Sequence, residues 1–226
     1  FSVNALWKNK IAVLVGDYLF SRGLLVAIDK GEYKMLHIIS RAIQDMSEGE
    51  LLQIEKARTM DIEEDVYYEI IRKKTASLIA AACALGRASA TDDDVEIEKM
   101  RLFGEKIGMA FQIKDDLFDY GDKDVGKPRG IDIKEKKLTL PLIYTLNHAD
   151  KRKKKQIINT VKRYNNDKAK VQEVIQYVHL HGGMEYATQV MNTYKNEALA
   201  ILDQFAHTPA RQALIDLVHF VINREK

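Results

Sequence analysis

Three carboxylates lie inside an otherwise apolar stretch near the middle of the chain, residues 111–120. Asp115 and Asp119 are four residues apart, so on a helix they lie one turn from each other on the same face. Asp116 lies about 100° round the helix from Asp115. Like charges at this spacing destabilise a helix, and a divalent cation would offset them. Oxygen ligands with no Cys or His nearby suit Mg²⁺. The stretch predicts a magnesium site, and its apolar residues argue against the alternative, a solvated acidic face.

A basic loop punctuated by glycine and proline follows the acids, in residues 121–141. Gly121 is placed to end the helix. The loop then carries Lys127, Lys136 and Lys137. Mg²⁺ usually shares its carboxylates with substrate phosphates, and ammonium groups bind the remaining phosphate oxygens. The acids and the lysines together therefore predict a diphosphate site.

The composition is that of a globular protein with ample apolar material for a core: 226 residues, 46% hydrophobic and 30% charged. A net charge of +2, mixed along the chain, gives no reason to expect a nucleic-acid partner. The single cysteine, Cys83, excludes a disulfide framework and fits a reducing cytoplasm. No run of about 18 apolar residues is present, so we expect no transmembrane helix, and no signal peptide is visible.

A three-to-four-residue apolar rhythm and the absence of proline before residue 128 predict an all-α protein with a single domain, 1–226. The first helices are expected at 5–28 and 33–60. A third helix begins near Asp61, and a fourth begins at Asp92–Asp94 and continues to the central acids. Negative charge is favourable at a helix start, so we interpret this acid triplet as capping. The tail, 210–226, is amphipathic and is expected to pack on the bundle.

The central motifs, taken together, are recognisable. Gln-x-x-Asp-Asp-x-x-Asp (112–119), Gly-Lys-x-x-Gly-x-Asp (126–132) and Lys-Leu-Thr-Leu-Pro (137–141) follow one another. This pattern resembles the second aspartate-rich region of the trans-isoprenyl diphosphate synthases, or polyprenyl synthetases, of the bacterial octaprenyl or geranylgeranyl type. Segments 16–22 and 47–53 are also similar to that family. The resemblance implies an isoprenoid synthase helical bundle around a central apolar cavity.

The resemblance also implies a Mg²⁺-dependent prenyltransferase. Such an enzyme joins an allylic prenyl diphosphate to isopentenyl diphosphate and releases a longer all-trans polyprenyl diphosphate. The implied metal ligands are Asp115 first, with Asp119 and Asp116 after it.

Other positions take roles in diphosphate binding by the same resemblance. Lys74 and Thr75 would bind the allylic diphosphate, and Asp115 and Lys74 are the predicted catalytic residues. Gln112 would position Asp115 or a phosphate oxygen. Lys127 and Lys137 would hold diphosphate from the loop, with Lys136 as the alternative to Lys137.

The chain departs from the family pattern in one respect. Family members carry two aspartate-rich motifs, and the first, which Arg-Arg follows, is not found in this sequence. The chain begins at Phe1 rather than Met. We expect either that the helices bearing the first motif precede Phe1, or that this polypeptide is incomplete and inactive alone.

The expected partners and the rival functions complete the hypothesis. The resemblance implies a cytoplasmic homodimer formed through the 5–28 and 33–60 helices, with at most peripheral membrane contact for product release. One rival is another class I terpene synthase, such as a cyclase, which typically lacks the combined motifs. The other is a non-catalytic or regulatory subunit of a heteromeric prenyl synthase. Such subunits tend to lose acids or lysines that are intact here, so we expect an elongating synthase.

Overall fold

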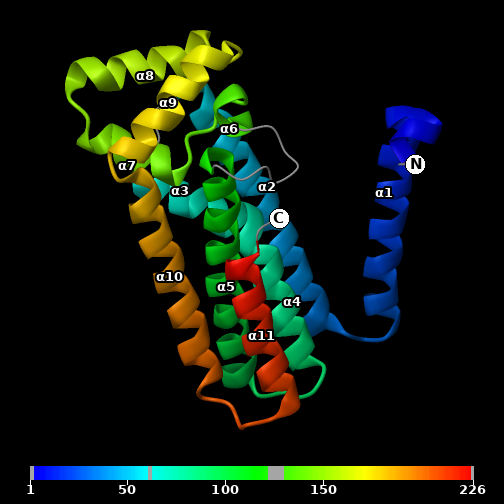
Figure 1. Ribbon diagram of the computed structural model, residues 1–226. Helices are drawn as coiled ribbons and strands as arrows, with labels where there is room; N and C mark the ends of the chain where they lie inside the picture. Colours follow the sequence, from blue (N-terminus) through cyan, green and yellow to red (C-terminus); the bar gives the residue numbers. More distant parts are fainter. Residues whose placement is uncertain (1–2, 61–62, 122–129, 225–226) are drawn as a thin grey trace. The chain divides into compact units, whose positions relative to one another are not determined.

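The structure is a computed structural model that describes residues 3–60, 63–121 and 130–224, and all regular elements in these ranges are helices (Figure 1). The all-α prediction is therefore confirmed. The elements are α1 (Val3–Asp29), α2 (Tyr33–Thr59), α3 (Glu64–Ile71), the π-helical turn η1 (Arg72–Ala76), α4 (Ser77–Ala88), α5 (Asp94–Tyr120), α6 (Ile131–Lys134), α7 (Leu140–His148), α8 (Lys151–Arg163), α9 (Lys168–Leu180), α10 (Gly183–Leu202) and α11 (Pro209–Asn223).

The chain divides into two compact units, Phe1–Arg41 and Ala42–Lys226. Within the first unit, Asn9–Asp29 of α1 is a 21-residue segment with a mean hydropathy of 1.8, long and apolar enough to cross a membrane by length and composition. The expectation of no transmembrane helix stays a prediction, because helices of soluble proteins also meet these two criteria. That expectation counted uninterrupted apolar residues, whereas Asp17 and Arg22 interrupt a segment that remains strongly apolar on average. Length and composition do not distinguish a membrane span from a helix that another protein covers.

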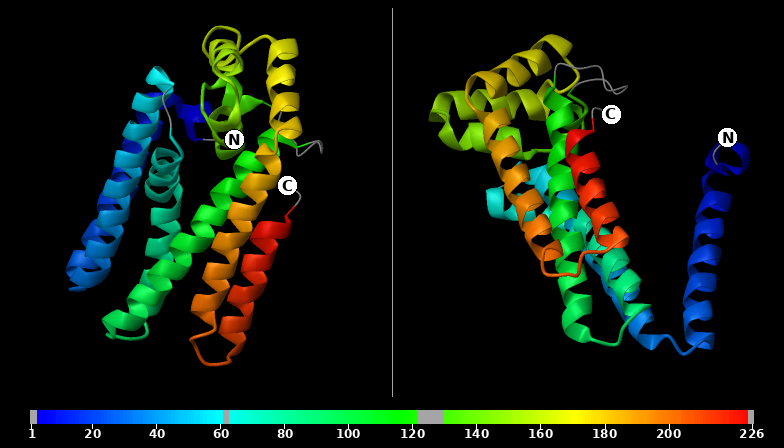
Figure 2. Two further views of the ribbon diagram at one scale, coloured as in Figure 1. Left: turned by 90° about the vertical axis from the view of Figure 1, so that its left-hand side faces the viewer. Right: turned by 60° about the horizontal axis from the view of Figure 1, so that its bottom comes forward.

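The second unit is built around α5. This helix packs most extensively against α4 and α10, and it also contacts η1, α11, α7 and α3 (Figures 1 and 2). Phe103, Ile113 and Tyr120 of α5 are completely or almost completely buried. Burying such side chains contributes about 1.5–3 kcal/mol each, so α5 is a rigid support for the polar residues that it carries.

The helix ends follow the expected capping chemistry in part. The Asp93 side chain accepts a hydrogen bond from the backbone N–H of Val95 (2.9 Å), which confirms that the acid triplet caps α5. Gly121 does end that helix, with an extended rather than a left-handed backbone (φ −68°, ψ 161°). Asp61 lies outside the described residues. The amphipathic tail forms α11, which packs on α10 and α5 as expected.

The expected third helix is divided by the π-helical turn η1. A π turn adds one residue to an α-helical turn, so it rotates the following side chains by about 100° relative to a continuous α-helix. Such turns occur frequently at functional sites. Lys74 and Thr75 lie within η1, so their directions depend on this irregularity.

Candidate active site

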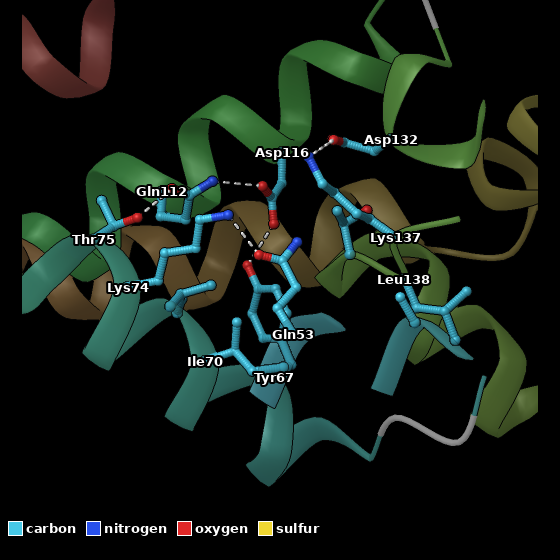
Figure 3. Close-up of a pocket in the computed structure, with 13 residues that line it drawn as sticks. Gln53, Tyr67, Ile70, Lys74, Thr75, Gln112, Asp116, Asp132, Lys137 and Leu138 are labelled. Atoms are coloured by element: carbon cyan, nitrogen blue, oxygen red, sulfur yellow. Dashed lines mark hydrogen bonds and ion pairs between the residues drawn. The ribbon is translucent and has the colours of Figure 1, made fainter. Parts of the chain in front are cut away.

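A cavity of about 90 Å³ lies where α2, α3, η1 and α5 meet the segment that leads into α7 (Figure 3). Its lining is mixed, with apolar side chains beside amide, hydroxyl and charged groups. The lining residues are Gln53, Ala57, Tyr67, Ile70, Ile71, Lys74, Thr75, Gln112, Asp116, Asp132, Lys137, Leu138 and Thr139. The cavity therefore brings together residues from segment 47–53, from the Lys74–Thr75 pair and from the three central motifs.

Lys74 and Thr75 both line this cavity. The Lys74 ammonium pairs with Glu50 (2.6 Å) and donates a hydrogen bond to Gln53 (2.7 Å). The Thr75 hydroxyl donates to the Gln112 side-chain carbonyl (2.8 Å). The contacts set both donors at the cavity wall, where diphosphate binding stays a prediction.

Asp116 is the buried acid of the cavity, with 4% of its surface exposed. Its carboxylate accepts hydrogen bonds from the Tyr67 hydroxyl (2.7 Å) and from the Gln112 amide (2.9 Å). Burial raises the pKa of Asp116 to about 7, and the negative charges of Asp132 and Asp115 add to this shift. The amide of Gln112 thus holds Asp116, one turn further along the helix, in place of the predicted Asp115.

Asp119 organises the chain that follows the acids. Its carboxylate accepts from the backbone N–H groups of Ile131 (2.8 Å) and Asp132 (3.3 Å). Its backbone carbonyl accepts from the N–H of Gly130 (3.1 Å). Burial raises the pKa of Asp119 to about 6, and the charge of Asp132 raises it further. Asp119 therefore holds the start of α6, which carries Asp132 at the cavity.

Asp115 has a different environment. It pairs with Arg224, at the end of α11, and the Arg224 guanidinium lies over the rings of Phe111 (4.2 Å) and Phe118 (5.5 Å). Asp115 is not among the residues that line the cavity. The acid ranked first from sequence thus lies beside the C-terminal helix, and its metal role stays a prediction.

Lys137 lines the cavity and lies 3.8 Å from Asp132 and 2.5 Å from Glu135. Burial lowers the pKa of Lys137, but the hydrogen bond to Glu135 and the charge of Asp132 outweigh it, so the net shift is upward. Lys136, the alternative, has a left-handed backbone (φ 59°) and is not part of the lining. Lys127 lies outside the described residues.

Within residues 3–60, 63–121 and 130–224, no three His, Cys, Asp or Glu side chains are grouped so that they alone could hold a metal ion. Asp116 and Asp132 nevertheless line one cavity, and the charge of Asp132 raises the pKa of Asp116. Mg²⁺ commonly takes one or two carboxylates and completes its shell with substrate phosphates and water. This pair of hard oxygen donors fits an ion that is bound together with a diphosphate.

Two polar residues of the cavity, Asp132 and Tyr67, have no role assigned from sequence. Asp132 belongs to the Gly-x-Asp motif, so its signal was present, but its spacing from the helical acids gave no geometric reason to group them. Tyr67 carries no comparable signal, because an aromatic residue in an amphipathic helix usually belongs to the core. Its hydroxyl is placed at Asp116 by the packing of α3 on α5.

Comparison with known proteins shows the family to which the chain is similar. The family model described as "Polyprenyl synthetase" matches residues 1–178. The octaprenyl diphosphate synthase of Escherichia coli is 32% identical over 227 residues, which cover all of this chain and 70% of that protein. Heptaprenyl diphosphate synthase component 2 of Geobacillus stearothermophilus is also 32% identical, over 99% of this chain and 69% of that protein.

Solved structures share the fold as well. The crystal structure of a polyprenyl synthase from Caulobacter crescentus, in complex with calcium and isoprenyl diphosphate, has a TM-score of 0.88 and 32% identity. The match covers 99% of this chain and 69% of that one. The match to the family model over most of the sequence and the extent of these similarities show that the chain belongs to the polyprenyl synthetase family.

Proposed function

We propose that this protein is a trans-polyprenyl diphosphate synthase. It would condense an allylic prenyl diphosphate with isopentenyl diphosphate to give a longer all-trans polyprenyl diphosphate, in a Mg²⁺-dependent reaction. The observation that carries the proposal is one cavity that brings together the donors Lys74, Thr75 and Lys137 with the carboxylate of Asp116. Family membership supports the same reaction.

The residues of the cavity have distinct roles in this proposal. Lys74 and Lys137 bind oxygens of the allylic diphosphate by charge-assisted hydrogen bonds, and the Thr75 hydroxyl adds a neutral donor. Gln112 connects Thr75 to Asp116 and fixes both side chains. Bound Mg²⁺, held by Asp116 and Asp132, would neutralise negative charge on the diphosphate.

The chemistry needs little more from the protein than charge and exclusion of water. The allylic C–O bond breaks and its electron pair leaves with the diphosphate, whose oxygens are bound by Lys74 and Lys137. The double bond of isopentenyl diphosphate then forms the new C–C bond with the allylic carbon. A proton is lost, which by family analogy goes to the released diphosphate. Donors that stabilise developing charge at fixed positions typically contribute several kcal/mol each, about 2.7–4.

A chain-elongation assay tests the proposal. The protein is incubated with farnesyl diphosphate, labelled isopentenyl diphosphate and Mg²⁺, and lipid products are resolved by length. We expect elongated products that disappear with EDTA and in Lys74→Ala, while Lys155→Ala, on the exposed start of α8, retains them. Absence of elongation by the folded chain would contradict activity of this chain alone, and elongation that appears only when a homologous partner chain is added would favour the alternative, a subunit of a heteromeric synthase.

We also propose that α1 is covered by a second copy of this chain. Exposed apolar side chains on this helix support the proposal: Ile11, Val13, Leu14, Val15, Tyr18, Leu19, Phe20, Leu25, Val26 and Ile28. Asp17 and Arg22 on the same helix favour a protein partner over lipid, since charged groups are costly inside a bilayer. The name "component 2" of one relative makes a distinct partner subunit the alternative. We also propose a cytoplasmic location, because the single cysteine is a free thiol and free thiols fit a reducing compartment.

A further inference from the structure

The second half of α2 crosses η1 at a distance that leaves no room for a side chain at residue 49. Gly49 is buried. A Cβ atom added there would lie 2.6 Å from the backbone N of Lys74, 2.9 Å from Cβ of Lys73 and 3.1 Å from the backbone C of Lys73. None of these atoms belongs to the flexible end of a side chain. A methyl group at residue 49 can therefore be accommodated only if α2 and η1 move apart.

The same crossing brings polar groups of α2 to the two lysines of η1. Glu48 pairs with Lys73 (3.1 Å), and Glu50 pairs with Lys74 (2.6 Å). Gln53 accepts a hydrogen bond from the Lys74 ammonium at the cavity wall (2.7 Å; Figure 3). These acceptors flank Gly49 on one helix, so the separation between α2 and η1 sets whether they reach the lysines.

We propose that Gly49 is a positioning residue for Lys74 and thereby determines how tightly the cavity binds diphosphate. The absence of a side chain at residue 49 lets α2 hold the π-helical turn, and with it the Lys74 ammonium, in the geometry that meets a diphosphate. The inference rests on the proposed function in one respect, that Lys74 binds diphosphate.

Two other glycines separate this role from ordinary packing. Gly104 is equally crowded, since a Cβ there would lie 2.7 Å from Ala80 Cα and 2.7 Å from the Ile79 carbonyl oxygen, but it touches α4 and not η1. Gly86, inside α4, has nothing within 4 Å of such a Cβ. Gly104→Ala therefore controls for a loss of stability by overpacking away from η1. Gly86→Ala controls for the replacement of glycine by alanine in a helix where no atom is crowded.

The first measurement is calorimetric binding of inorganic pyrophosphate to the full chain in the presence of Mg²⁺. We expect Gly49→Ala to bind at least tenfold more weakly than the unmodified chain. Gly86→Ala should be unchanged, and Gly104→Ala should lose thermal stability while its affinity stays within threefold. Unchanged affinity in a folded Gly49→Ala, or an equal loss in Gly104→Ala, would overturn the inference.

A second measurement needs no ligand. In isotope-labelled protein, the backbone amide resonances of Lys74 and Thr75 should move in Gly49→Ala and stay in place in Gly104→Ala. Unmoved resonances in Gly49→Ala contradict a positioning role.

If Gly49→Ala does not fold, Gln53→Leu removes an acceptor that the crossing brings to Lys74 while leaving the crossing itself intact. Its pyrophosphate affinity should fall at least threefold, and an unchanged affinity overturns the inference. Lys74→Ala separates the two levels of the argument. If Lys74→Ala loses binding but Gly49→Ala and Gln53→Leu retain it, the proposed function stands and only the role of Gly49 is lost. If the unmodified chain does not bind pyrophosphate with Mg²⁺, both fall.

Discussion

Tyr67 and Asp116, 49 residues apart in the chain, meet in a buried hydrogen bond of 2.7 Å between the tyrosine hydroxyl and the carboxylate. The bond joins α3 to α5 at the floor of the candidate active site. It also satisfies a carboxylate that is almost inaccessible to water. Tyr67 therefore supports the acid that we propose as part of the diphosphate site.

Removal of this donor should be costly. In Tyr67→Phe the Asp116 carboxylate keeps only the Gln112 donor, so the free energy of unfolding should fall by about 1–3 kcal/mol. Urea unfolding measures the change. Tyr164→Phe, which alters a partly exposed ring on the C-cap of α8, is the matched control and should differ by less than about 0.5 kcal/mol. Equal stability of the two variants would show that the bond contributes nothing.

Asp119 allows two roles to be separated. If Asp119 acts by holding the backbone N–H groups of Ile131 and Asp132, Asp119→Asn should retain part of the affinity for Mg²⁺-pyrophosphate, because its amide oxygen still accepts one hydrogen bond. Asp119→Ala should then be much weaker in Mg²⁺-pyrophosphate binding than Asp119→Asn. If Asp119 instead binds Mg²⁺ directly, both variants remove the negative charge that the ion needs, and both should lose the same amount of affinity for Mg²⁺-pyrophosphate.

The pair formed by Asp115 and Arg224 should contribute to the docking of α11. Arg224 is largely buried and also lies over Phe111, so the pair is stronger than a fully exposed one. A double-mutant cycle with Asp115→Ala and Arg224→Ala should give a coupling energy of about 1 kcal/mol, reduced by the partial exposure of Asp115. A coupling energy near zero in urea unfolding would mean that the ion pair does not contribute to the free energy of unfolding.

The exposed apolar side chains of α1 predict an oligomer. Leu14→Glu and Leu19→Glu each place a charge on a helix that we propose is covered by a second copy, so both should shift the protein to the monomer in size-exclusion chromatography with light scattering. Leu180→Glu, on a leucine that is 81% exposed at the end of α9, is the control and should keep the dimer. A monomeric unmodified chain, or dimers in all three variants, would refute this interface.

Cys83 should be unreactive in the native state. Burial raises the pKa of its thiol to about 11, and the thiolate is the reactive form. At pH 8 the reaction with a disulfide reagent should be about two hundredfold slower than in the urea-unfolded chain, where the pKa is near 8.5. Equal rates would show that α4 does not protect this thiol.

The sequence predicts the residues of the site better than it predicts their arrangement. Lys74, Thr75, Gln112, Asp116 and Lys137 were all selected from motifs and all line one cavity. Their contacts were harder to foresee, because they depend on geometry between helices. The π-helical turn coincides with the place where α2 crosses at Gly49, and local helix propensity holds no signal for such a crossing.

The acids illustrate the same limit. Spacing along an ideal helix put Asp115 and Asp119 on one face, yet their partners come from distant segments, Arg224 in one case and the start of α6 in the other.

The most direct test is a crystal structure of the protein with Mg²⁺ and a prenyl diphosphate or a bisphosphonate analogue. We predict phosphate density in the cavity beside Lys74, bridged by a metal ion to Asp116. The ligand bound elsewhere, or bound in the cavity without any metal between phosphate and carboxylate, would contradict the central claim.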